Sequence, residues 1–369
     1  KHFFAPAFAP VFFSLGMIAM IMLFHKSIGP HVLGWGVLAG GLCQLLFQLP
    51  FLRGRGIRYR PCFNLRHPGV REVLRLMAPA ALALGVVQLN QLVAPFFASY
   101  AKGGVSALQN AILLVQMPQG VFAIALSTVL LPTLSEHATR GDNHAFRRGM
   151  QDGLGLVLLF SIPSALFFIF FGREVIDAVF AGGQFTATDL DRTAPALLLY
   201  STGLIGMGGT VLANRFFYAL RDMKTPFLVA LASVALNLLL NLVFHFANPG
   251  AFALVALSNS LSVTANFVLL ILLVQRRMGR FRWGHIFLES GKITIAGCAM
   301  AAAAILVWHG LSGIFPQTFF WKIGLLVLAT AAATGIFYLI ARLLGVHEIA
   351  LLLSHLRKNK PPAEGGHNG

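Results

Sequence analysis

The chain has 369 residues, of which 57% are hydrophobic and 11% are charged, and its mean hydropathy is +0.76. A soluble domain carries about 25% charged residues, so this composition excludes an ordinary soluble protein and indicates a helical membrane protein. The net charge of +16 does not imply a nucleic-acid partner, because the basic residues lie in short loops between apolar runs, where they set membrane orientation.

Ten apolar runs are long enough to cross ~30 Å of hydrocarbon as helices. In chain order, the spans are expected at 5–24, 32–52, 76–100, 105–132, 153–171, 195–219, 227–247, 251–274, 293–310 and 322–344. The predicted fold class is therefore all-α, a polytopic membrane protein with about ten transmembrane helices.

The loops between these runs differ sharply in charge. Twenty lysines and arginines lie in alternate loops, and only four lie in the loops between them. The twenty occupy 53–75, 133–152, 220–226, 275–292 and the tail after residue 344. The positive-inside rule places these segments and both termini in the cytoplasm. The acidic loop 172–194 then faces outward, and "FRWGHIF" at 281–287 is predicted to form an interfacial helix.

The predicted spans contain amides and no carboxylates. Because no Asp or Glu lies inside a span, a proton relay through carboxylates is disfavoured. The third and fourth spans are joined by a short link and should form an antiparallel hairpin, which places Gln88 level with Gln119 and Gln91 level with Gln116. Asn90 lies in the same polar stretch, "GVVQLNQL".

Each polar group allows two interpretations. Pro118 removes a backbone hydrogen bond beside the glutamines, and the freed groups must face protein or water. The amides then either join helices or line an internal cavity. Asn237 and Asn241 share one face of the seventh span, either for packing or as a cation site. Arg215, near the end of the sixth span, either snorkels to the interface or contacts a phosphate.

Nothing in the sequence suggests enzyme chemistry. The three cysteines and twelve histidines are dispersed, without the spacing of metal ligands or disulfides, and no nucleotide-binding or serine-nucleophile motif is present. We therefore expect no catalytic residues, no metal and no bound cofactor. Coupling of transport to a monovalent cation or to protons is left open.

Four stretches resemble the MurJ/MviN family of lipid II flippases, part of a wider superfamily of multidrug, oligosaccharidyl-lipid and polysaccharide exporters. They are "MAPAALALGVVQLNQLVAPFFAS", "MPQGVFAIALSTVLLPTLSEHATRGD", "VFAGGQFTATDLDRTAPALLLYSTGL" and "NRFFYALRDMKTPF". The resemblance implies a two-lobe exporter fold with fourteen helices, of which this chain looks like helices five to fourteen. The first four helices are then expected to be missing.

The resemblance also implies a function and a division of the chain. The expected cargo is lipid II or a related undecaprenyl-linked substrate, moved by alternating access across the bacterial cytoplasmic membrane, with membrane lipids as further partners. The expected regions are 1–52 (last two helices of the N-terminal lobe), 53–75 (basic cytoplasmic loop), 76–280 (six-helix C-terminal lobe), 281–344 (interfacial segment and final helix pair) and 345–369 (cytoplasmic tail).

One motif departs from the family pattern. In the eighth family helix, an arginine, an aspartate and a glutamate fall on Leu113, Ile112 and Gln116 of this sequence. The neutral hairpin suits a less anionic cargo. Two alternatives therefore stay open: an exporter of another lipid-linked saccharide or of an amphipathic cation, and a degenerate membrane scaffold that no longer transports.

Overall fold

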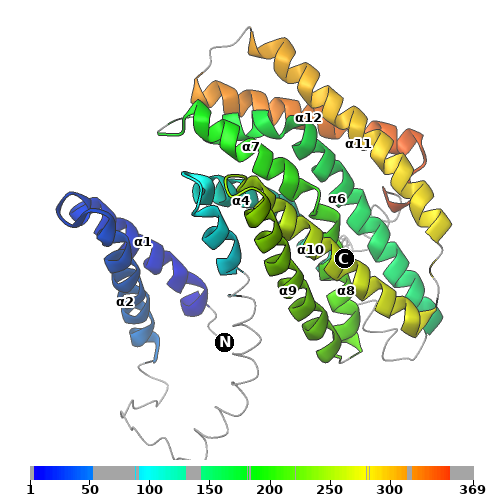
Figure 1. Ribbon diagram of the computed structural model, residues 1–369, viewed down its shortest axis with the longest axis horizontal. Coiled ribbons are helices and arrows are strands. Elements are labelled where there is room, and N and C mark those ends of the chain that lie inside the picture. The colour runs from blue at the N-terminus through cyan, green and yellow to red at the C-terminus, as the bar shows by residue number, and fades with distance from the viewer. Residues whose placement is uncertain are drawn as a thin grey trace, which may run out of the picture. The chain divides into compact units, whose positions relative to one another are not determined.

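The computed structural model describes residues 4–52, 88, 91–129, 143–180, 182, 184–220, 222–279, 281, 283–313 and 318–349, and the regular structure in these ranges is helical (Figure 1). The chain forms two compact units, Lys1–Met77 and Ala78–Gly369, which are described separately. The predicted loop at 53–75, Asn90, most of the third predicted span and the tail from residue 350 lie outside the described residues.

The first unit is a helical hairpin. It contains α1 (Phe4–Ile28), the short 3-10 helix η1 (Gly29–His31) and α2 (Val32–Leu52). The two helices pack closely, because a Cβ on Gly40 would lie 2.6 Å from the carbonyl oxygen of Phe13. The rings of Phe12 and Phe47 stack with centroids 4.0 Å apart. The first two predicted helices are therefore confirmed as an antiparallel pair.

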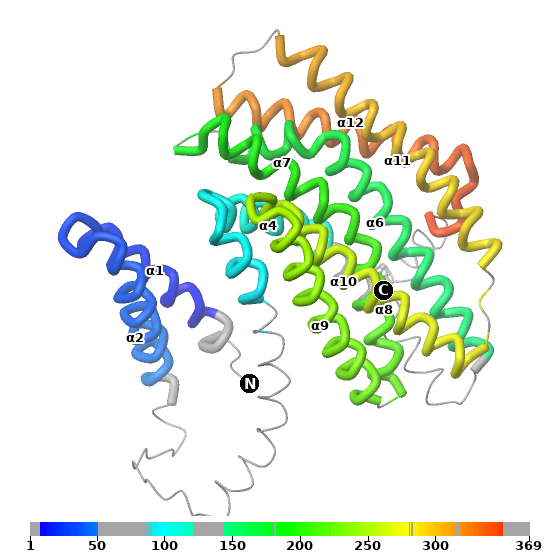
Figure 2. Tube along the Cα trace, viewed as in Figure 1, coloured from blue at the N-terminus to red at the C-terminus, as the bar shows by residue number. Residues whose placement is uncertain are grey.

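The second unit is a bundle of long helices (Figure 2). Its helices are α4 (Gly104–Val129), α6 (Asn143–Phe180), α7 (Ala187–Ser201), α8 (Leu204–Ala219), α9 (Lys224–Ala247), α10 (Ala253–Met278), α11 (Trp283–Ser312) and α12 (Phe319–Leu343). Within it, α6 packs against α7, α8 and α11, while α10 packs against α7, α8 and α9. α11 also packs along α12, and α4 packs on α7.

The prediction that residues 172–194 form a loop is wrong, because most of this segment is helical. α6 continues to Phe180, and α7 begins at Ala187. Thr186 caps α7 in a reciprocal pair with Asp189: the Thr186 hydroxyl accepts from the Asp189 backbone N–H, and the Asp189 carboxylate accepts from the Thr186 backbone N–H. This capping box satisfies two N–H groups and starts the helix in polar sequence.

Ion pairs hold the polar end of α6 in helical form. Asp177 accepts from the ammonium of Lys322 on α12 at 2.6 Å, and Glu174 lies 3.6 Å from the ring of His309 on α11. These partners are far away in the sequence, so hydropathy alone ended the predicted span too early. The carboxylates of Glu174 and Asp177 lie on α6 beyond the end of the predicted span 153–171.

The sixth predicted span is a bent pair of helices. The axes of α7 and α8 differ by 44° across Thr202 and Gly203. The hydroxyl of Ser260 on α10 donates to the carbonyl oxygens of Leu199 at 2.7 Å and Tyr200 at 3.3 Å. The break is compatible with an apolar surrounding because a neighbouring helix satisfies the freed carbonyls.

The segment 281–287 does not form a separate helix. α11 begins at Trp283 and runs unbroken to Ser312. Its buried residues Ile286, Glu289, Ile293, Ala296 and Met300 recur every three or four positions. One face of α11 is therefore packed from its first turn, which explains why the helix continues through this polar segment.

Six helical stretches in the described part of the chain are long and apolar enough to cross a membrane, and the bent pair α7–α8 would add a seventh. One of the six, Phe8–Pro50, contains both helices of the first unit. Lengths and hydropathies thus agree with a multi-pass membrane protein.

Candidate functional site

Gln116 and Gln119 lie three residues apart on α4, so their side chains are neighbours on one side of the helix. Gln116 is exposed in the second unit, together with Leu113 about one turn before it and Met117 next to it in the sequence. Gln88 and Gln91 are exposed as well. Leu113 therefore puts an apolar side chain on the accessible face of α4 at the position where the family motif has arginine.

Gln119 contacts a neighbouring helix. Its side-chain amide donates to the sulfur of Met207 on α8, and the residue is half-buried. This bond joins α4 to α8, whereas the packing interpretation expected a bond across the hairpin of the third and fourth predicted spans. The predicted pairing of Gln119 with Gln88, and of Gln116 with Gln91, stays a prediction.

Asn237 and Asn241 form a buried amide pair on α9. Both are less than 5% exposed. The Nδ2 of Asn241 donates to the backbone oxygen of Asn237 at 2.9 Å and to its Oδ1 at 3.2 Å. The Oδ1 of Asn241 is buried and has no hydrogen-bond partner among the described residues. The spacing of four residues thus places both amides on one face of α9, as the sequence predicts.

A small cavity lies beside this pair. Its volume is about 10 Å³, and its lining includes Asn241, Phe97, His245 and Phe252. Such a volume holds about one water-sized particle. The oxygens that the two amides offer are neutral, so the pair suits a monovalent cation or a water molecule better than a divalent cation, for which proteins use carboxylates.

Arg215 lies in the C-terminal half of α8, before its last turn. It is half-buried and precedes the fully buried Phe216 and Phe217. The two interpretations of Arg215, snorkelling and contact with a phosphate, both stay predictions.

Sequence reasoning missed a hydroxyl seam between α9 and α10. The hydroxyl of Ser233 on α9 donates to the carbonyl oxygen of Ser262 at 2.8 Å. Ser258, Ser262 and Asn266 are also buried on α10. Ser258, Ser262 and Asn266 recur every four residues within "SNSLSVTAN" at 258–266, and this spacing predicts one polar face on the helix.

The long apolar helices, the broken α7–α8 pair and the buried amides define a polytopic helical membrane protein. Within this class, the chain belongs to the family described as "Lipid II flippase MurJ", whose profile matches residues 1–330.

Curated relatives and a solved structure give the same result. The chain is 32% identical to the probable lipid II flippase MurJ of Buchnera aphidicola subsp. Acyrthosiphon pisum, covering 88% of this chain and 62% of that protein. It is 33% identical to the lipid II flippase MurJ of Burkholderia cenocepacia, covering 85% and 61%. A solved structure, lipid II flippase MurJ in an inward closed conformation, matches with a TM-score of 0.69 and 26% identity over 91% of this chain and 68% of that one. The chain spans about three fifths of the length of these curated relatives.

Proposed function

We propose that the chain belongs to a flippase that moves lipid II, or a related undecaprenyl-linked precursor, from the cytoplasmic to the outer leaflet by alternating access. The observation that carries this proposal is the match of the lipid II flippase family over residues 1–330. The name shared by the relatives favours this cargo over the other exporter functions and over a scaffold that does not transport.

The physical task is to replace water around a head group that carries a pyrophosphate. Such a group cannot cross hydrocarbon unaided, because its charges lose their hydration. Exposed amides and guanidinium groups can substitute for that water. In our proposal, the polar wall consists of Gln88, Asn90, Gln91, Gln116 and Gln119, and Arg215 contacts the phosphate in the inward-open state.

We further propose that Asn237 and Asn241 bind a monovalent cation that is coupled to transport. The unpartnered buried oxygen of Asn241 supports this role, because such an oxygen is available as a ligand. No other cofactor is required for this mechanism, and proton coupling is the competing proposal.

The test of the main proposal is a leaflet-accessibility assay in proteoliposomes that contain the chain and fluorescent lipid II. We expect lipid II to become accessible to a membrane-impermeant reagent faster than in protein-free vesicles. A second lipid-linked saccharide without the peptide measures cargo preference. Acceleration of this second lipid alone would favour the alternative exporter, and no acceleration by folded protein would contradict the proposal.

Orientation is a separate proposal with its own test. The charge asymmetry places both termini in the cytoplasm of the bacterial cell. In a variant without Cys43, Cys62 and Cys298, a cysteine at the exposed position Ala187 should react with an impermeant maleimide from outside, and one at Arg276 should not. The opposite labelling pattern would contradict this orientation.

A further inference from the structure

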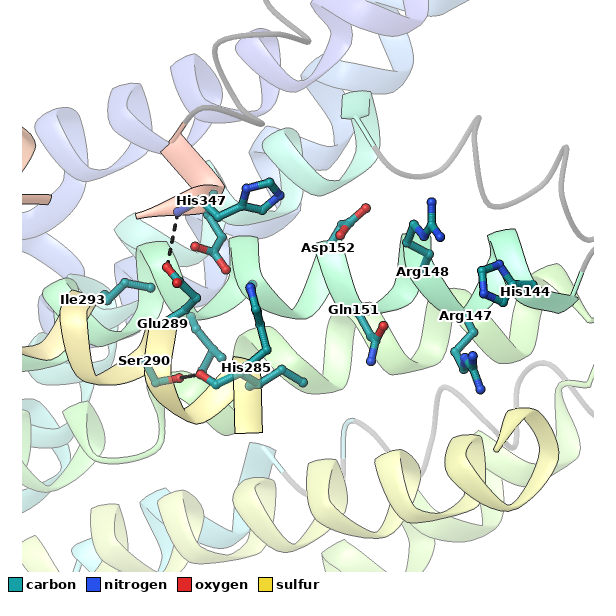
Figure 3. Close-up of a pocket in the computed structure, with 14 residues that line it drawn as sticks. His144, Arg147, Arg148, Gln151, Asp152, His285, Glu289, Ser290, Ile293 and His347 are labelled. Carbon is teal, nitrogen blue, oxygen red and sulfur yellow. Dashed lines mark hydrogen bonds between the residues drawn. The ribbon is translucent and has the colours of Figure 1, made fainter. Parts of the chain in front are cut away.

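A polar pocket lies at one end of the second unit, away from the amides discussed above. Its volume is about 230 Å³, and three segments line it: the first turns of α6, the first turns of α11 and the turn that follows α12. Figure 3 shows His144, Arg147 and Arg148 toward one end of the pocket and Glu289 with His347 toward the other. All three segments lie next to basic loops, so the pocket sits at the level expected for lipid head groups.

A tight turn brings the third segment into the pocket. After α12, Gly345 has φ +63°, the backbone N–H of Val346 donates to the carbonyl of Ala341, and that of Gly345 donates to the carbonyl of Arg342. These two bonds form a Schellman motif, which reverses the chain direction. The turn thereby places His347 and Glu348 against α6 and α11.

Glu289 is already satisfied by protein groups. Its Oε1 accepts from the ammonium of Lys292 at 2.7 Å, and its Oε2 accepts from the backbone N–H of His347 at 3.2 Å. The negative charge of Glu289 is therefore compensated within the protein, and it does not determine which ligand the pocket prefers.

Glu348 differs from Glu289 in its hydrogen bonding. It is only 6% exposed and lines the pocket, yet its Oε2 has no hydrogen-bond partner among the described residues. Its side chain packs directly on Gly155 of α6, where a Cβ would lie 2.6 Å from Oε1. A buried polar atom without a partner is unfavourable, so a group that supplies a partner would bind favourably here.

The protonation state of Glu348 further limits which kind of ligand group can bind beside it. Burial raises the pKa of Glu348. A hydrogen bond from its own backbone N–H lowers the pKa, the ionised Glu289 raises it, and His347 and His285 lower it, but burial prevails. A carboxyl group that is disfavoured as an anion pairs better with a neutral hydroxyl than with an ammonium group.

The opposite end of the pocket favours an anion. Arg147 and Arg148 have no ion-pair partner among the described residues, and both lie in the first turns of α6. The positive end of the helix dipole and two guanidinium groups together attract a phosphate. The exposed side chains of Phe287 and Leu288 lie next to the lining residues of α11, where acyl chains could contact them.

We propose that this pocket binds a phosphoglycerol group, with the phosphate at Arg147 and Arg148 and a glycerol hydroxyl at Glu348. The source is either an anionic phospholipid with this head group or a soluble glycerol phosphate. The site is separate from the amides of the proposed transport path, so it can be tested by binding without any transport measurement.

The experiment measures binding of dioctanoyl phosphatidylglycerol to the full chain in neutral detergent, by native mass spectrometry. The double substitution Arg147→Gln and Arg148→Gln should weaken binding at least ten-fold. The matched control, Arg276→Gln with Arg342→Gln, removes the same charge from exposed positions that do not line the pocket and should change binding less than two-fold. Equal losses in both double variants, or no loss in the first, would overturn the proposal.

Single substitutions and a competition experiment complete this test. Arg148 is exposed, so Arg148→Gln alone should leave the fold intact and still weaken binding about three-fold. Glu348→Gln should keep affinity within two-fold, whereas Glu348→Leu should lower it at least five-fold; unchanged binding in the leucine variant would contradict the hydroxyl contact. Competition by glycerol 3-phosphate identifies a soluble source, and its absence identifies the lipid.

Discussion

The contact between α8 and α10 depends on a glycine and can be tested by adding one methyl group. A Cβ on Gly206 would lie 2.7 Å from the Cα of Thr264, 2.8 Å from its Oγ1 and 2.9 Å from its backbone nitrogen. Ordinary contact distances are about 3.5–4.0 Å, and two of these three atoms belong to the α10 backbone. Gly206→Ala should therefore push the two helices apart by about 1 Å.

The expected loss of stability follows from two opposing effects. Overpacking costs about 1–3 kcal/mol, while alanine gains about 0.5–1 kcal/mol over glycine inside a helix. We expect a net loss of about 1–2 kcal/mol, measured as the free energy of unfolding in mixed micelles titrated with SDS. Gly335 on α12 is the matched control, because a Cβ there meets nothing within 4 Å.

The two variants should change the free energy of unfolding differently. Gly335→Ala should be neutral or more stable, because only the helix propensity changes. If Gly206→Ala were as stable as Gly335→Ala, the close contact between α8 and α10 would not exist in the folded protein, and the reasoning would be refuted.

Four further substitutions test individual residues. Hydrogen bonds from the backbone and side chain of Thr225 lower the pKa of Asp222 to about 2; its stabilisation is therefore present above pH ~4 and lost as the pH falls through about 2, so Asp222→Asn should lower the melting temperature at pH 7 but not near pH 2. Gln116→Leu should lower transport with little effect on stability, and Gln119→Leu should lower transport as well while costing about 1 kcal/mol of stability, because it also removes the bond to Met207; unchanged transport per folded molecule in both variants would contradict the proposed polar wall. Arg215→Lys should lower transport about ten-fold if a guanidinium fork holds the phosphate, and unchanged transport would rule out that role.

Hydropathy predicted the lengths of α9 and α10 better than the length of α6. α9 and α10 differ from the predicted spans by only a few residues. α6 is much longer than its predicted span, because its polar end is held by Lys322, a residue 145 positions away in the sequence. A local pattern contains no information about such a partner, so the acidic end of α6 was assigned to a loop.

In the candidate site, too, the sequence predicted an arrangement within one helix and missed a contact between two helices. The spacing of Asn237 and Asn241 was sufficient to place both on one face of α9, and their mutual hydrogen bond follows from it. The partner of Gln119, in contrast, is Met207 on α8, which no periodicity within α4 can indicate. Equal depth in a predicted hairpin is therefore a weaker guide than helical spacing, because it fixes the height of a side chain but not its direction around the helix.

The buried serines and the buried asparagines of α9 and α10 differ in whether their side-chain polar atoms have hydrogen-bond partners. The hydroxyls of Ser258 and Ser262 on α10 donate to carbonyl oxygens one turn earlier, and that of Ser233 donates across to α10, so each of these groups is satisfied by the fold itself. The Oδ1 atoms of Asn241 on α9 and of Asn266 on α10 are buried without such a partner among the described residues, each at a cost of about 1–3 kcal/mol. An apolar side chain of similar size would avoid this cost. The two asparagines, unlike the serines, are therefore not explained by helix packing alone.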